Sequence, residues 1–312
     1  MTTTSLKEEK PLVIHKKAVH SKRNKWSGLK KLLFVLPALI PLLVFWIFPM
    51  LYSVYISFTN WDFMSEDYDF VGLENYKNLL SSQGFYEAFG NTVYFMVGSI
   101  IPTMVGGLLL ALLVHKKMAG VGFYRTILFS PWITPMVAVS IVWSWIFEPR
   151  VGVANWILSL FHLPQLEWLG SSTWAMPAVI IVTVWKGVGW AMIFYLDALK
   201  KIPPDLYEAA SLDGASKWYQ FRHITLPLIS PTTFFLSIIL AIDLLQAYDQ
   251  IQILTQGGPS NSTRTLLYMY YQSAFEQFNV GEATAIATVI IVLAALLSVV
   301  QFWISKKWVH YD

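Results

Sequence analysis

Long apolar segments dominate this sequence and limit the folds that it can adopt. A helix needs about 20 mostly apolar residues to cross a bilayer, because each residue adds only about 1.5 Å to its length. Six segments meet this requirement, at about residues 32–58, 89–114, 123–147, 174–199, 228–248 and 283–304. With 55% hydrophobic and only 13% charged residues, a soluble fold could not bury so much apolar surface. The sequence therefore predicts an all-α polytopic membrane protein with six transmembrane helices.

Basic residues are distributed unevenly between the predicted spans. Of the 22 Lys and Arg residues, 18 fall in the N-terminal tail, in the second-to-third and fourth-to-fifth connections, and at the C-terminus. The other connections hold Lys77, Arg150 and Arg264, and Lys186 lies inside the fourth span. Because cytoplasmic loops of membrane proteins carry the excess of Lys and Arg, both termini are predicted to be cytoplasmic.

This orientation divides the chain into three parts. The first is a basic cytoplasmic tail, residues 1–31, which is expected to lie on anionic membrane lipid. The second is a six-helix membrane domain, residues 32–306, in which a cytoplasmic loop at 200–227 joins the fourth and fifth spans. The third is a short cytoplasmic C-terminus, residues 307–312.

The cytoplasmic loop contains a compact polar segment, EAASLDGASKWYQFRHITLP, at residues 208–227. Asp205 and Glu208 have the spacing of a capping box at the start of a short helix. Gly214 is placed to end that helix in the left-handed conformation, and a second helical stretch is expected at 216–225. Because a helix this short is marginal alone, the pattern indicates either docking on a partner or an amphipathic loop resting on the bilayer.

The same segment resembles the EAA loop found in permease subunits of ATP-binding-cassette (ABC) importers. That loop has Glu-Ala-Ala, a Gly four residues later, and Ile-x-Leu-Pro after about nine more. The matching residues are Glu208, Ala209, Ala210, Gly214, Ile224, Leu226 and Pro227. The run LYEAASLDGASKWYQFRHITLPLISP is similar to the carbohydrate branch of these permeases, as are DALKKIPPDLYEAA and YDQIQILTQGGPSNSTRTL.

The resemblance implies a type I ABC importer permease (MetI-like) fold that imports a sugar or oligosaccharide. The short helix of the loop would dock on a cytoplasmic ATPase subunit, with Glu208 facing basic groups, and Asp213 joins the matching residues as a coupling candidate. The implied assembly contains a second, homologous permease in a heterodimer, two ATPases that bind ATP and Mg, and an extracytoplasmic solute-binding protein. No nucleic-acid partner is implied.

Motifs for enzymatic chemistry are absent from the sequence. It contains no G-x-x-x-x-G-K-[ST], no H-E-x-x-H and no G-x-S-x-G. The absence of cysteine excludes disulfides, thiol catalysis and Cys-ligated metals. We therefore expect no catalytic residue, no metal site and no bound cofactor in this chain, and ATP binding on another polypeptide.

Ionisable residues inside the spans are candidates for the substrate path, because charges are costly in a membrane. Lys186 lies in the fourth span, Asp243 and Asp249 in the fifth, and one hypothesis is that Lys186 pairs with either carboxylate across a cavity. A purely structural ion pair is the alternative. Sugars bind to hydroxyl, amide and aromatic groups, and the resemblance places such residues on these two spans. The candidates are Thr183, Trp190, Tyr195, Gln246 and Tyr248.

Two other functions stay open at this point. An ABC importer permease for glycerol phosphate esters or another polyol would line its cavity with basic residues, and Lys186 is the one candidate. A stand-alone ion-coupled secondary transporter would need inverted repeats and broken helices, and it leaves the EAA loop unexplained. Lys186, Leu244 and Ala247 depart from the maltose-type pattern, which argues against maltose itself. The sequence does not name the sugar.

Overall fold

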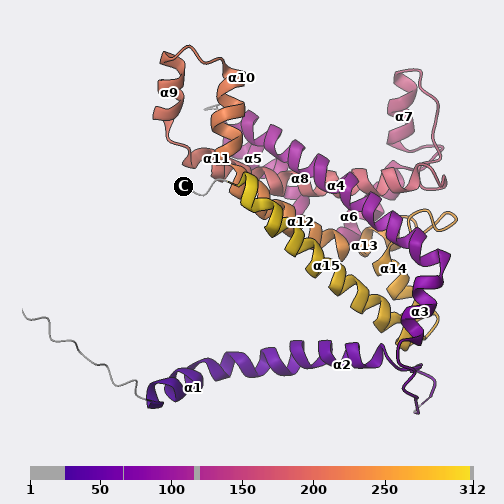
Figure 1. Cartoon of the computed structure of the whole chain (residues 1–312). Coiled ribbons are helices and arrows are strands. Elements are labelled where there is room, and N and C mark those ends of the chain that lie inside the picture. Colours follow the sequence, from indigo (N-terminus) through magenta and orange to yellow (C-terminus); the bar gives the residue numbers. More distant parts are fainter. Residues whose placement is uncertain (1–24, 66, 116–119, 310–312) are drawn as a thin grey trace, which may run out of the picture. The chain divides into compact units, whose positions relative to one another are not determined.

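The computed structural model describes residues 25–65, 67–115 and 120–309, and these ranges are helical apart from their connections and two isolated bridges (Figure 1). The chain separates into two compact units, one ending at Leu51 and the other beginning at Tyr52. The helices that carry the first predicted span are α1 (Lys25–Leu42), the π-helical segment η1 (Leu43–Ile47) and α2 (Phe48–Ile56). Together they provide an apolar segment of 26 residues, Lys31–Ile56, that is long enough to cross a bilayer.

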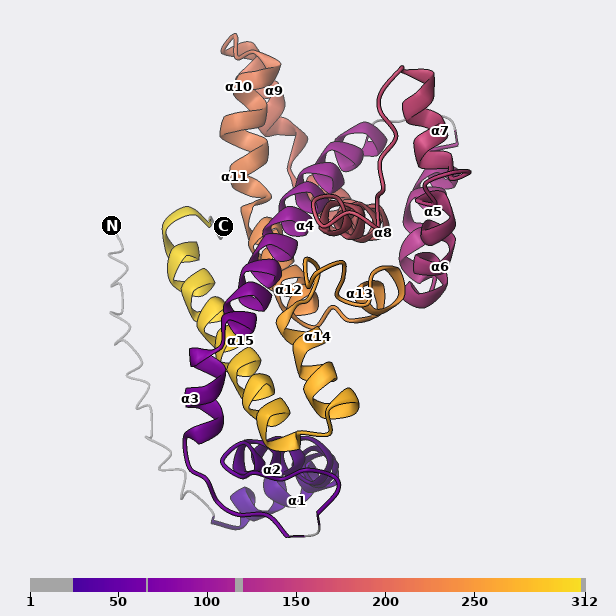
Figure 2. The same ribbon diagram turned by 90° about the vertical axis from the view of Figure 1, so that its right-hand side faces the viewer.

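The remaining elements follow in chain order. They are α3 (Glu74–Ser81), α4 (Gln83–His115), α5 (Val121–Ile133), α6 (Met136–Ile146), α7 (Val153–Leu160), α8 (Ala175–Lys201), α9 (Pro204–Leu212), α10 (Lys217–Gln220), η2 (Phe221–Thr225), α11 (Leu226–Leu228), α12 (Ser230–Leu245), α13 (Asp249–Leu254), α14 (Leu266–Tyr271), η3 (Gln272–Glu276) and α15 (Val280–Trp308). Figure 2 shows α8 nearly end-on beside α4, with α5 and α6 on its other side.

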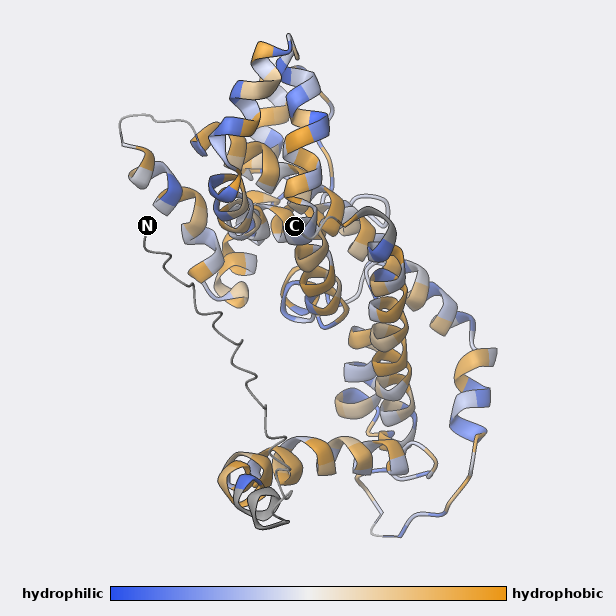
Figure 3. Ribbon diagram, turned by 60° about the vertical axis from the view of Figure 1, so that its left-hand side comes forward, coloured by the Kyte–Doolittle hydropathy of each residue, from blue (hydrophilic) through white to orange (hydrophobic). Residues whose placement is uncertain are grey.

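The described residues provide four helices that can each cross a membrane alone, and six spans if two bent helix pairs count as one span each. The prediction of an all-α membrane protein is confirmed, and each predicted span falls on one of these elements. Apolar residues cover much of the long helices (Figure 3), as expected for surfaces that face lipid or a partner helix. The fold thus satisfies backbone hydrogen bonds within helices, which a bilayer demands.

The third span differs from the expected continuous segment, because α5 and α6 meet at a bend of 98°. Thr134 has extended backbone angles there (φ −71°, ψ 135°). The cause is Pro135, which has no N–H to donate and disfavours the helical conformation of the residue before it. The fifth span is also bent, by 60°, between Leu228 and Ser230. Its membrane helix α12 ends at Leu245, so the predicted boundary at Tyr248 was three residues too far.

Close approach of backbones joins α8 to its neighbours. A Cβ atom placed on Gly107 of α4 would lie 2.6 Å from the Cβ of Ala191, so only glycine allows this crossing. A Cβ atom on Gly189 would collide with the carbonyl oxygen of Leu128 in α5. Small residues at such crossings let membrane helices pack tightly without a hydrophobic driving force between them. These crossings bring the backbones of α4, α5 and α8 into direct contact.

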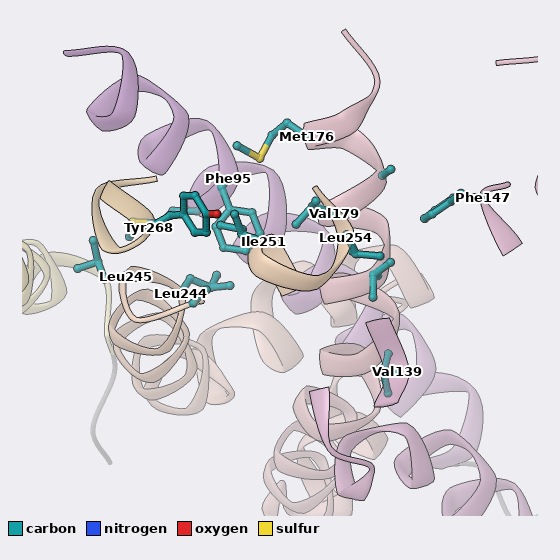
Figure 4. Close-up of a cluster of buried hydrophobic side chains, with 14 of the residues drawn as sticks. Phe95, Val139, Phe147, Met176, Val179, Leu244, Leu245, Ile251, Leu254 and Tyr268 are labelled. Atoms are coloured by element: carbon teal, nitrogen blue, oxygen red, sulfur yellow. The ribbon is translucent and has the colours of Figure 1, made fainter. Parts of the chain in front are cut away.

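A buried apolar cluster supports the region where α6, α8, α12 and α13 meet (Figure 4). Phe95 comes from α4, Val179 and Val182 from α8, and Ile251 from α13. The ends of α12 and the start of α13 are therefore fixed against α8. This positions the residues between them, 246–248, beside the fourth span.

Candidate functional site

The short helix α9, in the loop predicted to be cytoplasmic, starts differently from the expected capping box. Its N-cap is Pro203, and no side chain caps the first turn. Pro204 occupies the first helical position, where its fixed φ favours helix and its missing N–H costs nothing. Asp205 is therefore already inside the first turn and cannot act as the cap. Its carboxylate still favours the helix start, because the N-terminal end of the helix dipole is positive.

The end of α9 has the predicted left-handed glycine. Gly214 has φ +80°. The Ala215 N–H donates to the Ala210 carbonyl oxygen at 2.9 Å, and the Gly214 N–H donates to the Ser211 carbonyl oxygen at 3.1 Å. These two hydrogen bonds are those of the Schellman motif. No atom lies within 4 Å of a Cβ placed on Gly214, so backbone conformation alone requires glycine here.

Polar contacts hold α9 against the following helical segment. The buried Gln220 donates through Nε2 to the Ser211 hydroxyl at 2.8 Å, and the hydroxyls of Tyr207 and Thr225 are 2.9 Å apart. The Ser216 hydroxyl caps α10 by accepting from the Tyr219 N–H at 3.2 Å. We call residues 203–228 the cytoplasmic hairpin, after its predicted side of the membrane.

The opposite face of α9 is open. None of its residues is buried, and the Leu212 side chain is 90% exposed. A shallow groove of about 460 Å³ is lined by Tyr207, Glu208, Ser211, Leu212 and Lys217. Of the remaining coupling candidates, Ala209 and Asp213 are exposed, Ala210 and Pro227 are half-buried, and Leu226 is exposed. Ile224 packs against the cluster formed by the inner ends of α8 and α12.

A cavity of about 400 Å³ lies between α4, the bend of the third span, α8 and the end of α12. Six of the eight substrate-path candidates line it: Thr183, Lys186, Asp243, Gln246, Tyr248 and Asp249. The carboxylates and the Gln246 amide are exposed, whereas Thr183, Lys186 and Tyr248 are half-buried. The fold thus brings these residues together, and their role in transport stays a prediction.

Trp190 and Tyr195, the other two candidates, do not line the cavity. The Trp190 ring stacks on Trp132 at a centroid distance of 5.1 Å and contacts Phe194 at 4.8 Å. Tyr195 is buried in the cluster near the inner ends of α8 and α12. Trp190 follows Lys186 by one helical turn, and Trp132 stands between it and the cavity. The aromatic residues that line the cavity are therefore Trp132 and Tyr248.

The hypothesis of an ion pair between Lys186 and Asp243 or Asp249 is wrong for this structure. The Lys186 ammonium donates to the Trp132 carbonyl oxygen at 2.8 Å and lies 5.0 Å from the centroid of the Trp132 ring. Within the described ranges, the one ion pair shorter than 4.0 Å is Lys201–Asp197, at 2.7 Å. The cause is the bend after α5, because carbonyls in the last turn of a helix lack intrahelical donors and accept from other groups.

Eight cavity residues were not among the candidates from the sequence: Thr103, Trp132, Met136, Gly187, Leu240, Leu244, Ala247 and Gln250. Trp132 and Met136 flank the bend, so Pro131 and Pro135 were the signal that could have pointed to them. Among the described residues, no group of three or more His, Cys, Asp or Glu side chains could hold a metal ion. The arrangement can hold a polar solute through hydroxyl, amide, ammonium, carboxylate and indole groups.

Comparisons with known proteins agree with this architecture. Residues 92–310 match the family described as "Binding-protein-dependent transport system inner membrane component". Over 278 residues the chain is 37% identical to the probable ABC transporter permease protein YurN of Bacillus subtilis, covering 88% of this chain and 95% of that protein. It is 35% identical, over 278 residues, to the multiple sugar-binding transport system permease protein MsmF of Streptococcus mutans, covering 88% and 94%.

A solved structure is also similar. It is a crystal structure of a bacterial alginate ABC transporter in complex with a periplasmic protein that carries an alginate pentasaccharide. One of its chains superposes with a TM-score of 0.79 at 25% identity, covering 91% of this chain and 97% of that chain. The chain therefore belongs to the family of binding-protein-dependent transport system inner membrane components, and it is a membrane transport subunit rather than an enzyme.

Proposed function

We propose that this chain is the permease subunit of an ABC importer that moves a sugar or oligosaccharide into the cytoplasm while partner subunits hydrolyse ATP. The observation that carries the proposal is α9, an exposed helix of nine residues that internal hydrogen bonds hold in one orientation. A helix this short gains stability when a partner covers it. A chain without a phosphate-binding loop needs such a partner as its source of energy.

The partner at α9 is a cytoplasmic ATPase subunit. Leu206 and Leu212 offer apolar contact, and Glu208 offers a carboxylate beside them at the groove. An interface of this kind combines an apolar anchor with charges that select the partner and its orientation. ATP and Mg bind to two such ATPases, one for each permease. The coupling residues are those of the hairpin: Glu208, Ala209, Ala210, Asp213, Gly214, Ile224, Leu226 and Pro227.

The chemistry of the cavity favours a neutral polyhydroxylated solute. Sugar hydroxyls both donate and accept, so they suit the carboxylates of Asp243 and Asp249 as well as the Lys186 ammonium. The indole of Trp132 provides an apolar face for the C–H side of a sugar ring. A phosphate ester would meet two carboxylates and one ammonium, and like charges at close range repel. This favours sugars over glycerol phosphate esters.

The distribution of basic residues supports cytoplasmic termini and a cytoplasmic hairpin, because 18 of 22 Lys and Arg residues fall on that side. A basic tail (1–31), a membrane domain (32–306) and a C-terminus (307–312) follow from it. The opposite side faces the solute-binding protein. A second, different permease completes the path. The exposure of Asp243, at the end of the membrane helix α12, and of Gln246 and Asp249 just after it supports a partner on this side of the cavity.

Transport follows from the direct connection between the hairpin and the fifth span. The hairpin ends with η2 and α11 and leads into α12, whose outer end lines the cavity. When ATP closes the ATPase pair, the two hairpins approach each other and α12 shifts. The cavity then opens outward and receives the solute from the binding protein. Alternating access of this kind requires that ATP binds one state better than the other.

The test is purification of the chain from its native membrane, with identification of the copurifying proteins and assay of ATP-driven sugar uptake in proteoliposomes. We expect a phosphate-loop ATPase and a second six-span permease to copurify. The variant Glu208→Arg should lose the ATPase and the uptake, whereas Glu276→Arg, at an exposed carboxylate outside the hairpin, should keep the ATPase. Solute uptake by the chain alone, without ATPase, would instead establish an ion-coupled secondary transporter.

A further inference from the structure

The connection between α6 and α8 contains a helix whose outward face is apolar. No residue of α7 (Val153–Leu160) is charged. Val153, Trp156, Ile157 and Leu160 follow the spacing i, i+3, i+4 and i+7, so they share one face. Their side chains are 51%, 61%, 45% and 56% exposed. A helix on the surface of a water-soluble protein turns its polar residues outward, which is the opposite arrangement.

The other face of α7 is held firmly against the protein. Asn155 is buried, and its Nδ2 donates to the carbonyl oxygens of Pro149 at 2.8 Å and Leu166 at 2.9 Å. Its Oδ1 accepts from the Leu166 N–H at 3.1 Å and from the Trp168 indole N–H at 2.9 Å. The amide thus uses both donors and accepts twice. These bonds fix the rotation of α7, so its apolar face points outward as a consequence of the fold.

The position of α7 relative to the spans is shown from two directions. Figure 1 places it near the Ala175 end of α8, away from the end that leads to α9 and α10. In Figures 1 and 2 its axis runs across α8. Because α8 is a membrane-spanning helix, a helix that crosses its end lies along the membrane surface. By the orientation proposed above, that surface is the outer one.

Exposed apolar residues also stand before and after α7 in the sequence. Val142 and Trp145, near the end of α6, are exposed. Trp156 in α7 and Phe161 directly after α7 are exposed as well. Tryptophan is enriched at membrane interfaces, where its ring contacts acyl chains and its N–H reaches polar headgroups. Charged residues stand before α7 and not on it, at Glu148 and Arg150.

We propose that α7 is an interfacial helix whose Val153, Trp156 and Leu160 side chains insert into the outer leaflet of the bilayer. The partner of this face is lipid. An apolar helix face in the plane of the membrane is a known way for proteins to contact the boundary between headgroups and acyl chains. The hydrogen bonds of Asn155 then hold α7 in the rotation that turns its apolar face toward the acyl chains. The helix would hold the outer end of the third and fourth spans at a fixed level in the membrane.

Single cysteines provide the test, because the chain has none of its own. Leu160→Cys, labelled with an environment-sensitive fluorophore, is reconstituted with its copurifying subunits into lipid nanodiscs. We expect loss of fluorescence with lipids that carry a nitroxide near the headgroup, less loss with a nitroxide deep in the acyl chain, and little with aqueous iodide. Ser172→Cys, at an exposed polar residue later in the same connection, should respond mainly to iodide. Ile157→Cys repeats the measurement if the first variant does not assemble.

Three results would overturn the proposal. Iodide quenching at residue 160 equal to that at residue 172 would place α7 in water. Protection from both quenchers in the assembled complex would mean that another permease subunit covers the face. Protection that arises only when the solute-binding protein is added would make α7 a docking site for that protein. Sugar uptake by the unlabelled variants verifies that each complex is intact.

Discussion

The cytoplasmic hairpin and the membrane cavity differ in how far along the chain their contacts reach. The links that hold the hairpin join residues 9 and 18 positions apart, Ser211 to Gln220 and Tyr207 to Thr225. The cavity depends on a contact between Lys186 and Trp132, which are 54 positions apart, and on residues from α4, α5, α6, α8 and α12. The hairpin can therefore keep its shape while the membrane helices move, whereas the cavity changes with any shift between them.

The largest effect should follow from Gly214→Pro. The ring of proline fixes φ near −65°, and Gly214 has φ +80°, so the turn between α9 and α10 cannot form. We expect complete loss of the copurifying ATPase and of ATP-driven uptake. Gly72→Pro is the matched control, because Gly72 also has positive φ (+60°) but lies in the connection before α3. Retention of the ATPase by Gly214→Pro would show that α9 is not the contact.

Lys186→Met tests the cavity without touching the hairpin. Losing a hydrogen bond from a charged group costs about 1.5–3 kcal/mol, which corresponds to a decrease in uptake of about tenfold or more. Uptake of labelled sugar is the measurement, and ATPase copurification should not change. Lys201→Met, in the same helix, removes only an exposed ion pair with Asp197 and should have little effect. Normal uptake with Met at 186 would remove Lys186 from the substrate path.

Gln220→Ala tests whether the hairpin is held from within. The variant removes the donor to the Ser211 hydroxyl and leaves a small void, at a cost of about 1 kcal/mol or more. Hydrogen exchange of the α9 amides should accelerate, with no change in α8. Lys217→Met removes only a 3.3 Å contact to the Gln220 side-chain oxygen and serves as the control. Equal exchange in the Gln220 variant and the parent would mean that other contacts fix α9.

The smallest effect is expected from Tyr207→Phe, which removes one hydroxyl from the 2.9 Å contact with Thr225. The expected loss is about 0.5–1.5 kcal/mol in the stability of the hairpin. A double-mutant cycle with Thr225→Val, read by thermal unfolding, isolates the coupling between the two hydroxyls. Strict additivity of the two substitutions would show that the contact contributes nothing.

Features that depend on residues close in the sequence could be predicted, whereas contacts between residues far apart in the sequence could not. The spans follow from hydropathy, and Gly214 from the spacing that ends a helix. The capping box was wrong because Pro204 takes the first helical position before Asp205 can act as the cap. The contact between Lys186 and Trp132 was missed because its acceptor is a backbone carbonyl oxygen. The sequence does not indicate which carbonyl lacks a helical donor at a distant bend.

The bend between α5 and α6 has a mechanical consequence. A straight helix passes a displacement from one membrane surface to the other, but a helix broken by 98° does not. Here α5 packs along α8 and α6 packs against α13, so the two halves belong to different neighbours. The corner works as a pivot whose two arms can swing separately. Because Trp132 and Met136 lie on either side of that pivot, swinging one arm widens or narrows the solute space without sliding a whole helix through the bilayer.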